Sequence, residues 1–365
     1  MAFWAKQPVH YWNYKFINMG ANMKAFISSR IPQQWLDKIA EKYEVDHYDW
    51  AAAGSMLDRE AFLSRMQGCE LVVTESDEID AQMLDQCPDL AAIVDFRGTV
   101  VNVDIPAATR NGIVIINTPG RNADAVADLT VAFMIMVARN VLPSIKTLKD
   151  GLWAERGKRY AYVTHQGYDM PGKVVGLVGL GAIGRLVAKR LAGFGVRLIG
   201  YDPYVDAQAA QEFGVKSVDL DTVFKESDFV SLHVPMNEHT RDMIGERELR
   251  LMKPSAYLIN TSRAGVMQEE ALIRCLKENW IAGAALDVYH EEPIAPDYPL
   301  LDLPNVICTP HIGGASHDVV NHMAEIGVGG LFDFMEGKDT YTIINPQAVQ
   351  TARDKMHKKL GRSTG

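Results

Sequence analysis

Apolar runs rich in β-branched residues alternate with amphipathic stretches through the first third of the chain. The apolar runs lie at 24–28, 70–74, 90–96 and 113–117. The stretches between them carry apolar residues at helical spacing and lie at 33–43, 58–66, 79–86 and 105–111. Strands that alternate with helices predict a parallel sheet covered on both faces, and hence an α/β domain.

A second set of alternating elements follows a long apolar stretch at 122–140. Its Ala, Val and Met content predicts a buried helix between two domains, which Pro143 is expected to end or bend. After a polar stretch at 151–172, further strands are predicted at 173–178, 196–201, 229–234, 256–260, 284–288 and 306–309. A last helical run at 316–336 would carry the chain back to the first domain.

This order of elements predicts a discontinuous first domain wrapped around a continuous second one. We expect the first domain at 23–121 and 317–365 and the second at 122–316. Residues 1–22 form an N-terminal extension, for which a surface arm or a dimer contact is expected.

A glycine-rich motif joins the first two predicted strands of the second domain. It reads Gly179-Leu180-Gly181-Ala182-Ile183-Gly184 and opens an amphipathic stretch. Strand, G-x-G-x-x-G, helix, strand and acid in this order are typical of dinucleotide binding. The first glycine permits a tight turn, the second lets the backbone approach the pyrophosphate, and the third lets the helix pack on the strand.

Asp202 ends the strand after this motif, close to the spacing of an acid that binds the ribose diol. Its charge would repel a 2′-phosphate, and no Arg or Lys stands among Pro203, Tyr204 and Val205. The sequence therefore predicts NAD rather than NADP as the cofactor.

Composition and charge exclude several other classes of protein. At 47% hydrophobic and 23% charged residues the chain has an ordinary globular composition, and a net charge of −9 disfavours nonspecific binding to nucleic acid or acidic membranes. Because no apolar run has the length of a membrane span and no signal peptide is evident, we expect a cytoplasmic location. The four scattered cysteines form no metal-binding cluster, so no metal is expected.

Three polar motifs follow predicted strands of the second domain. They are Ile259–Gly265, which contains Arg263; Ala284–Pro293, which contains Asp287 and Glu292; and Cys308–Gly314, which contains His311. Since parallel strands share a carboxyl edge, these motifs are expected where the nicotinamide end of the cofactor lies.

With the glycine-rich motif, Asn117–Arg121 and His233-Val234-Pro235, these motifs resemble the D-isomer-specific 2-hydroxyacid dehydrogenases over roughly residues 24–345. The likeness is greatest to phosphoglycerate dehydrogenase-like members without a C-terminal regulatory domain. It implies two doubly wound parallel-sheet domains, with an NAD-binding Rossmann domain inserted into a flavodoxin-like substrate domain. It also implies a homodimer whose cleft closes on ligand, and hydride transfer between a D-2-hydroxy acid and its 2-oxo acid.

The resemblance implies roles for individual side chains. Arg263 resembles the arginine that binds the substrate carboxylate, and His311 resembles the general acid/base. Glu292 resembles the partner of that histidine, and Asp287 the acid that binds the nicotinamide amide. Further cofactor contacts are expected from His233 (chiefly its backbone), Val234, Pro235, Thr261, Ser262, His311 and Gly313. These residue types suit the chemistry, because an imidazole can exchange a proton near neutral pH while a carboxylate fixes its tautomer.

Arg97, Gly98 and Thr99 follow a predicted strand of the first domain and are expected to bind substrate, together with Arg263 and His311. The family's loop is glycine-rich here, whereas Arg97 adds a guanidinium. It indicates either a substrate with a second anionic or hydroxyl-rich end, or an interdomain salt bridge. Thr74-Glu75 and Asp95 at the neighbouring strand ends disfavour a phosphate group.

Two other functions fit the same motifs. An NAD-sensing, corepressor-like protein would keep these residues without catalysing a reaction. Phosphite dehydrogenase-type chemistry uses the same architecture, whereas formate oxidation is disfavoured because those relatives pair the histidine with glutamine rather than with Glu292.

Overall fold

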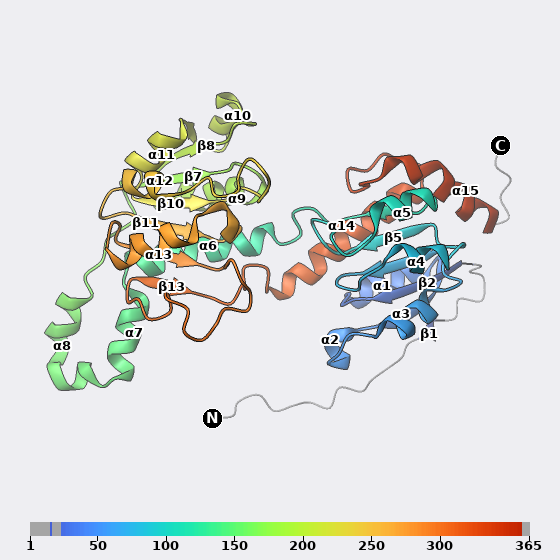
Figure 1. The fold of residues 1–365 in the computed structure, drawn as a ribbon, viewed down its shortest axis with the longest axis horizontal. Helices are drawn as coiled ribbons and strands as arrows, with labels where there is room; N and C mark the ends of the chain where they lie inside the picture. Colours follow the sequence, from blue (N-terminus) through green and yellow to red (C-terminus); the bar gives the residue numbers. More distant parts are fainter. Residues whose placement is uncertain (1–14, 17–22, 360–365) are drawn as a thin grey trace. The chain divides into compact units, whose positions relative to one another are not determined.

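The chain folds into two units, each built around one sheet (Figure 1). The structure, a computed structural model, describes residues 15–16 and 23–359, so most of the predicted extension at 1–22 lies outside the described residues. One unit combines the chain up to Arg121 with the chain from Ser316 onward, and the other is the continuous segment Asn122–Ala315. Both are parallel-sheet α/β units, which confirms the predicted fold class.

The sheet of the first unit has the strand order β1-β3-β2-β4-β5-β6. Its strands are β1 (Lys15–Phe16), β2 (Met23–Ser28), β3 (Tyr43–Tyr48), β4 (Leu71–Thr74), β5 (Ala92–Asp95) and β6 (Val114–Ile116). All neighbours pair in parallel except β1, which is antiparallel to β3. Counted along the chain, the five parallel strands follow the order 2-1-3-4-5, which is that of flavodoxin.

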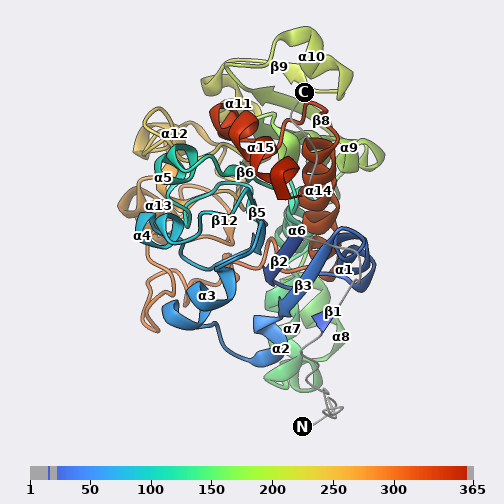
Figure 2. The ribbon, with the colours of Figure 1, turned by 90° about the vertical axis from the view of Figure 1, so that its right-hand side faces the viewer.

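Two hydrophobic cores cover the two faces of this sheet. One core holds α1 (Gln33–Ala40), α14 (His317–Met335) and α15 (Val349–Lys359), and the other α3 (Arg59–Met66), α4 (Ala81–Asp85) and α5 (Ile105–Arg110). In β2, Ala25 and Ile27 face the first core and Phe26 the second, as the two-residue period of a strand requires. Figure 2 shows α1 and α14 on one side of the sheet and α3 and α4 on the other. A short helix, α2 (Trp50–Ala53), follows β3.

The sheet of the second unit is parallel throughout, in the order β13-β12-β11-β10-β7-β8-β9. The strands are β7 (Val174–Val178), β8 (Arg197–Tyr201), β9 (Lys216–Ser217), β10 (Phe229–Leu232), β11 (Tyr257–Asn260), β12 (Gly283–Leu286) and β13 (Val306–Cys308). From β9 the order reads 3-2-1-4-5-6-7, which is the Rossmann arrangement.

Helices cover both faces of this second sheet. One core contains α6 (Ala123–Ala138), α9 (Ala182–Leu191) and α10 (Ala207–Glu212), and the other α11 (Leu220–Glu226), α12 (Glu246–Leu251) and α13 (Glu269–Lys277). Short 3-10 helices lie at Ala192–Phe194, Ala264–Val266 and Pro346–Ala348. The carboxyl ends of β7, β10, β11, β12 and β13 therefore meet at one edge, which carries the candidate site.

Two local predictions were wrong, and one helix was not predicted. The first helix ends at Ala40, and Tyr43 begins a strand, because 43–48 alternates buried and less buried residues. The polar stretch at 151–172 contains a helix, α8 (Leu152–Thr164), whose side chains are not buried, so its sequence lacks an apolar stripe. The long helix breaks at Asn140, in a left-handed conformation, and Pro143 lies in the first turn of α7 (Val141–Lys149), where its missing N–H costs little.

Among the described residues, no single helix has the length and apolarity needed to cross a membrane. The bent pair of α6 and α7 passes that test by length and composition only. The inward face of α6 is used in the core of the second unit, where Val131, Phe133 and Met134 are buried.

Candidate active site

The glycine-rich loop between β7 and α9 is shaped by steric limits at two glycines. Gly179 has a φ of +98°, and a Cβ there would lie 2.8 Å from the carbonyl carbon of His233. A Cβ on Gly184 would lie 2.2 Å from the carbonyl oxygen of Gly179, so only glycine lets α9 pack this close. A Cβ on Gly181 would meet no described atom within 4 Å, so the loop leaves open space there.

These features fit the pyrophosphate of NAD. The helix α9 starts at Ala182, and the N–H groups of its first turn, which includes Ile183 and Gly184, have no partner within the helix. Asp202 follows β8, and its carboxylate accepts hydrogen bonds from the N–H groups of Leu180 (2.8 Å) and Tyr204 (2.9 Å). The acid thus braces the loop, and its remaining acceptor capacity suits a ribose diol.

His311 and Glu292 form the central pair of the site. Nδ1 of His311 lies 2.6 Å from Oε2 of Glu292, and Oε1 of that carboxylate accepts a hydrogen bond from the N–H of Tyr289 at 2.9 Å. Partial burial opposes the charged form of Glu292. The hydrogen bonds from His311 and Tyr289, with the charges of His311 and Arg263, outweigh that cost and lower its pKa. The carboxylate is therefore held ionised beside the imidazole.

Asp287 fixes the loop that carries His311. It follows β12, is 1% exposed, and accepts hydrogen bonds from the hydroxyl of Thr309 (2.5 Å) and the N–H groups of Ile312 (2.8 Å) and Gly313 (2.7 Å). His311 itself has a φ of +53°, a left-handed conformation that a non-glycine residue adopts only when its surroundings hold it. The contact of Asp287 with a nicotinamide amide stays a prediction. The structure itself shows the hydrogen bonds of Asp287 within the loop.

Arg263 follows β11 in extended backbone and is exposed. Its Nη1 donates to the carbonyl of Ser262 at 2.7 Å. The turn is held by Asn260, a buried residue that was not predicted to belong to the site. The side-chain oxygen of Asn260 accepts from the N–H (3.0 Å) and hydroxyl (2.9 Å) of Ser262, and its amide donates to the carbonyl of Arg263 (3.1 Å). The sequence did offer one sign that Asn260 belongs to the site, because it ends a predicted strand close to Ser262 and Arg263.

Two other predicted cofactor residues are buried at the same edge. The hydroxyl of Thr261 lies 2.8 Å from that of Thr130 on α6. His233 follows β10, and neither ring nitrogen has a hydrogen-bond partner among the described residues. Burial lowers the pKa of His233 to about 4, so its imidazole is neutral near pH 7. The N–H of His233 donates to the carbonyl of Val178 at 2.7 Å, which places the start of His233-Val234-Pro235 beside the glycine-rich loop.

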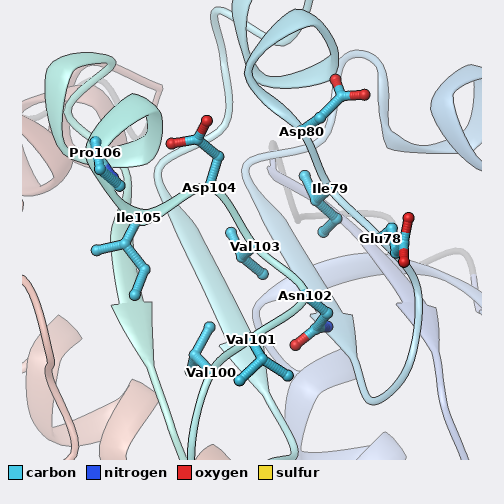
Figure 3. A pocket seen from close by; sticks show the side chains of 10 residues that line it. All are labelled: Glu78, Ile79, Asp80, Val100, Val101, Asn102, Val103, Asp104, Ile105 and Pro106. Atoms are coloured by element: carbon cyan, nitrogen blue, oxygen red, sulfur yellow. The ribbon is translucent and has the colours of Figure 1, made fainter.

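The predicted substrate loop lies in the first unit, after β5. Nη1 of Arg97 donates to the carbonyl of Glu75 at 3.4 Å, and the carbonyl of Gly98 accepts from the side chain of Asn117 at 2.8 Å. Gly98 and Thr99 are exposed. A hollow of about 550 Å³ lies further along the same loops, lined by residues 78–80 and 100–106 (Figure 3). None of the predicted site residues lines this hollow.

Comparisons with known proteins show which family the chain resembles. A sequence model of the D-isomer specific 2-hydroxyacid dehydrogenase, NAD binding domain, matches residues 131–313. A glyoxylate reductase of Thermococcus litoralis is 39% identical over 330 residues, 90% of this chain and 98% of that one. A glyoxylate reductase of Korarchaeum cryptofilum is 38% identical over 328 residues, 90% of this chain and 97% of that one. The solved structure of a glyoxylate reductase from Paecilomyes thermophila has a TM-score of 0.72 at 26% identity, covering 90% of this chain and 100% of that chain.

Proposed function

The chain belongs to the D-isomer specific 2-hydroxyacid dehydrogenase family and is an NAD-dependent oxidoreductase that acts on a CH–OH group; on that premise we propose that Arg263, Glu292 and His311 carry the reaction. The observation that supports this assignment best is the 2.6 Å contact between Nδ1 of His311 and Glu292. All three residues belong to the second unit, which we propose as the NAD-binding domain. The first unit is proposed as the substrate domain.

His311 acts as the acid/base in this proposal. Oxidation of a 2-hydroxy acid removes a hydride from carbon and a proton from the hydroxyl, and bound NAD supplies the hydride acceptor. Because Nδ1 is engaged by Glu292, the other ring nitrogen, Nε2, takes the hydroxyl proton and returns it in the reverse reaction. Glu292 fixes the tautomer and stabilises the imidazolium that forms.

Arg263 orients the substrate in this proposal. A guanidinium binds a carboxylate through two parallel N–H groups, which determines which face of the 2-oxo carbon receives the hydride. The turn braced by Asn260 would limit the freedom of this side chain. Because two relatives are named glyoxylate reductases, we include glyoxylate among the 2-oxo acids to be tested.

Replacement of His311 by alanine tests the assignment. We expect kcat/KM for the reduction of glyoxylate by NADH to fall roughly 10²- to 10⁴-fold, the usual contribution of a general acid/base. The measurement is NADH consumption, with NADH binding as the control. Turnover near that of the wild type would refute the role of His311. If the wild-type protein binds NADH but does not consume it with any of the 2-oxo acids tested, the result would instead favour an NAD sensor.

A homodimer is also proposed. The helices α7 and α8 expose several apolar side chains, namely Leu142, Ile145, Leu148, Trp153, Tyr162 and Val163. Exposed apolar side chains on neighbouring helices are typical of protein interfaces, and a second copy of this chain would cover them.

A further inference from the structure

Three arginines belong to segments that leave the carboxyl edge of the first unit's sheet. Arg30 comes shortly after β2, Arg97 after β5 and Arg121 after β6. Because β2, β4, β5 and β6 pair in parallel in that order, these segments lie at one edge. Glu75 follows β4, which lies between β2 and β5 in the sheet. The charges of all three arginines act on its carboxylate. The group is hereafter called the arginine cluster: Arg30, Arg97 and Arg121 with Glu75 and Asp95.

The carboxylate of Glu75 uses few of the guanidinium N–H groups. Its Oε1 lies 3.8 Å from Nη2 of Arg30 and 3.9 Å from Nη1 of Arg121, and both distances are too long for a hydrogen bond. Arg97 makes one weak bond, at 3.4 Å, to the carbonyl oxygen of Glu75 and none to its carboxylate. Among the described residues, Oε2 of Glu75 and Nε of Arg30 have no hydrogen-bond partner. Nη1 of Arg121 also contacts Sδ of Met323 at 3.8 Å, but most of the guanidinium N–H groups of the cluster have no hydrogen bond to a described carboxylate.

Asp95, the last residue of β5, is the second carboxylate of the cluster. It is fully buried, and neither oxygen has a hydrogen-bond partner among the described residues. Burial raises its pKa to about 7, although the charges of Arg97 and Arg121 and the nearby side chain of Asn102 act in the opposite direction. Burial likewise raises the pKa of Glu75, against the pull of the three arginines.

The charges of the cluster do not balance. Three guanidinium groups stay protonated near pH 7, so even with both acids ionised, three positive and two negative charges leave a net charge of +1. Because burial raises the pKa of both acids, protonation of either one makes this net positive charge larger. An anionic group of the substrate would offset it.

We infer that the arginine cluster binds the distal carboxylate of the substrate, which makes the favoured substrate a 2-oxo or 2-hydroxy dicarboxylic acid. The inference rests on the proposed function, in which Arg97 takes part in substrate binding. Arg97 and Arg121 supply charge-assisted hydrogen bonds to this carboxylate. Arg30 lies over the ring of Trp50, with its guanidinium carbon 5.2 Å from the ring centre, and adds its charge from that fixed position.

A pair of five-carbon acids tests the wild-type protein directly. 2-Oxoglutarate and 2-oxopentanoate share a chain and differ in the distal carboxylate. We expect kcat/KM with NADH to be about 10- to 100-fold higher for 2-oxoglutarate, chiefly through KM, which is the usual effect of a hydrogen bond to a charged group. Equal values for the two acids would overturn the inference.

The variants R97M and R121M test which residues produce the preference. Each should reduce the ratio of kcat/KM for 2-oxoglutarate to that for 2-oxopentanoate by about tenfold or more. The control R110M removes an exposed arginine from the last turn of α5 and should keep the wild-type ratio. A wild-type ratio in both R97M and R121M would contradict the assignment. R97K, which keeps the charge but not the fork of donors, serves if R97M does not fold, and should lower the ratio by a smaller factor.

Failure of the inference and failure of the proposed function give different results. If glyoxylate is reduced but the dicarboxylate is not preferred, the arginine cluster has no role in recognising an anion and the dehydrogenase assignment stands. If a hydroxyl-rich 2-oxo acid exceeds 2-oxoglutarate and its advantage is lost in R97M, the cluster binds hydroxyl groups and the anion site is refuted. If no 2-oxo acid is reduced although NADH binds, the proposed function itself fails.

Discussion

His311 and Glu292 show how one contact between side chains determines a chemical role. The imidazole is held from two directions: Glu292 engages Nδ1, and Asp287 binds the hydroxyl of Thr309 before the residue and the N–H groups of Ile312 and Gly313 after it, while His311 keeps a left-handed conformation. A loose histidine would spend much of its time away from a reacting hydroxyl group. The loop therefore supplies orientation as well as a proton acceptor.

The variant E292Q separates these two contributions. Glutamine keeps the size and can still accept a hydrogen bond from Nδ1, but it cannot stabilise an imidazolium by its charge. We expect kcat to fall by about tenfold or more while NADH affinity stays within about twofold of the wild type. The measurement is steady-state reduction of glyoxylate, with E291Q on the neighbouring acid as the control. Unchanged kcat in E292Q would show that the carboxylate is not needed.

Asp95 gives a prediction about stability and pH. Its pKa rises on folding, from the ordinary 3.8 to about 7, because the carboxylate is buried. Between these values the folded state binds more protons than the unfolded state, so this group lowers stability as the pH rises from about 4 to 7. In D95N that loss is absent. The free energy of unfolding of D95N relative to the wild type should therefore increase by on the order of 1–3 kcal/mol between pH 5 and pH 8.

Urea unfolding at the two pH values measures this difference. The control is D302N, at an exposed aspartate of the second unit, which should show no such trend. A difference between D95N and the wild type that does not change with pH would mean that Asp95 is ionised throughout this range.

At the scale of elements, the joint between β7 and α9 depends on glycine for two different reasons. Gly184 is needed for packing within the protein, whereas Gly181 borders open space. G184A should lose about 1–3 kcal/mol of stability, because its methyl group would overlap the carbonyl oxygen of Gly179. G181A should unfold like the wild type but bind NADH at least about tenfold more weakly, since its methyl group would occupy space expected for the pyrophosphate.

Thermal unfolding and NADH titration of both variants check this pair of expectations. Normal NADH binding by G181A would place the pyrophosphate elsewhere. Full stability in G184A would show that α9 can shift without cost.

The elements that sequence patterns predict well are those buried on both faces. The runs that became β2, β4 and β5 are almost wholly apolar, as strands inside a parallel sheet must be. The strand β3 lies near the sheet edge, where its exposure mixes polar residues into the pattern, and it was predicted in part as helix. The helix α8 buries no side chain, so nothing in its apolar pattern could mark it.

Sequence reasoning reached the candidate site unevenly for a similar reason. Arg263, Glu292 and His311 stand in short motifs directly after strands, so a local reading could place them at one sheet edge. Arg30 and Arg121 come together with Glu75 only through the strand order of the first sheet, which brings distant segments side by side. Local patterns carry no information about such pairings, and of this group Arg97 alone was predicted to bind substrate.

At the scale of the whole molecule, the exposed apolar residues of α7 and α8 predict the oligomeric state. We expect the wild type to be a dimer in solution and the double variant L148K/V163K to be monomeric, because two lysines would carry unpaired charge into the interface. Light scattering coupled to size-exclusion chromatography measures the mass. Y341S, which alters an exposed tyrosine of the first unit, is the control and should stay dimeric. A dimeric double variant would place the interface elsewhere.

The split composition of the first unit has a consequence for how the protein is made. Its sheet is translated early, but the core on one face is completed by Met323, Val328 and Leu331 of α14, which leave the ribosome only after the whole second unit. The second unit, being continuous, has all its core residues available sooner. Until α14 emerges, β2, β4 and β5 present an unfinished apolar face, the kind of surface on which nascent chains aggregate or recruit chaperones. A truncation just before His317 would leave that face covered by α1 without α14 and α15.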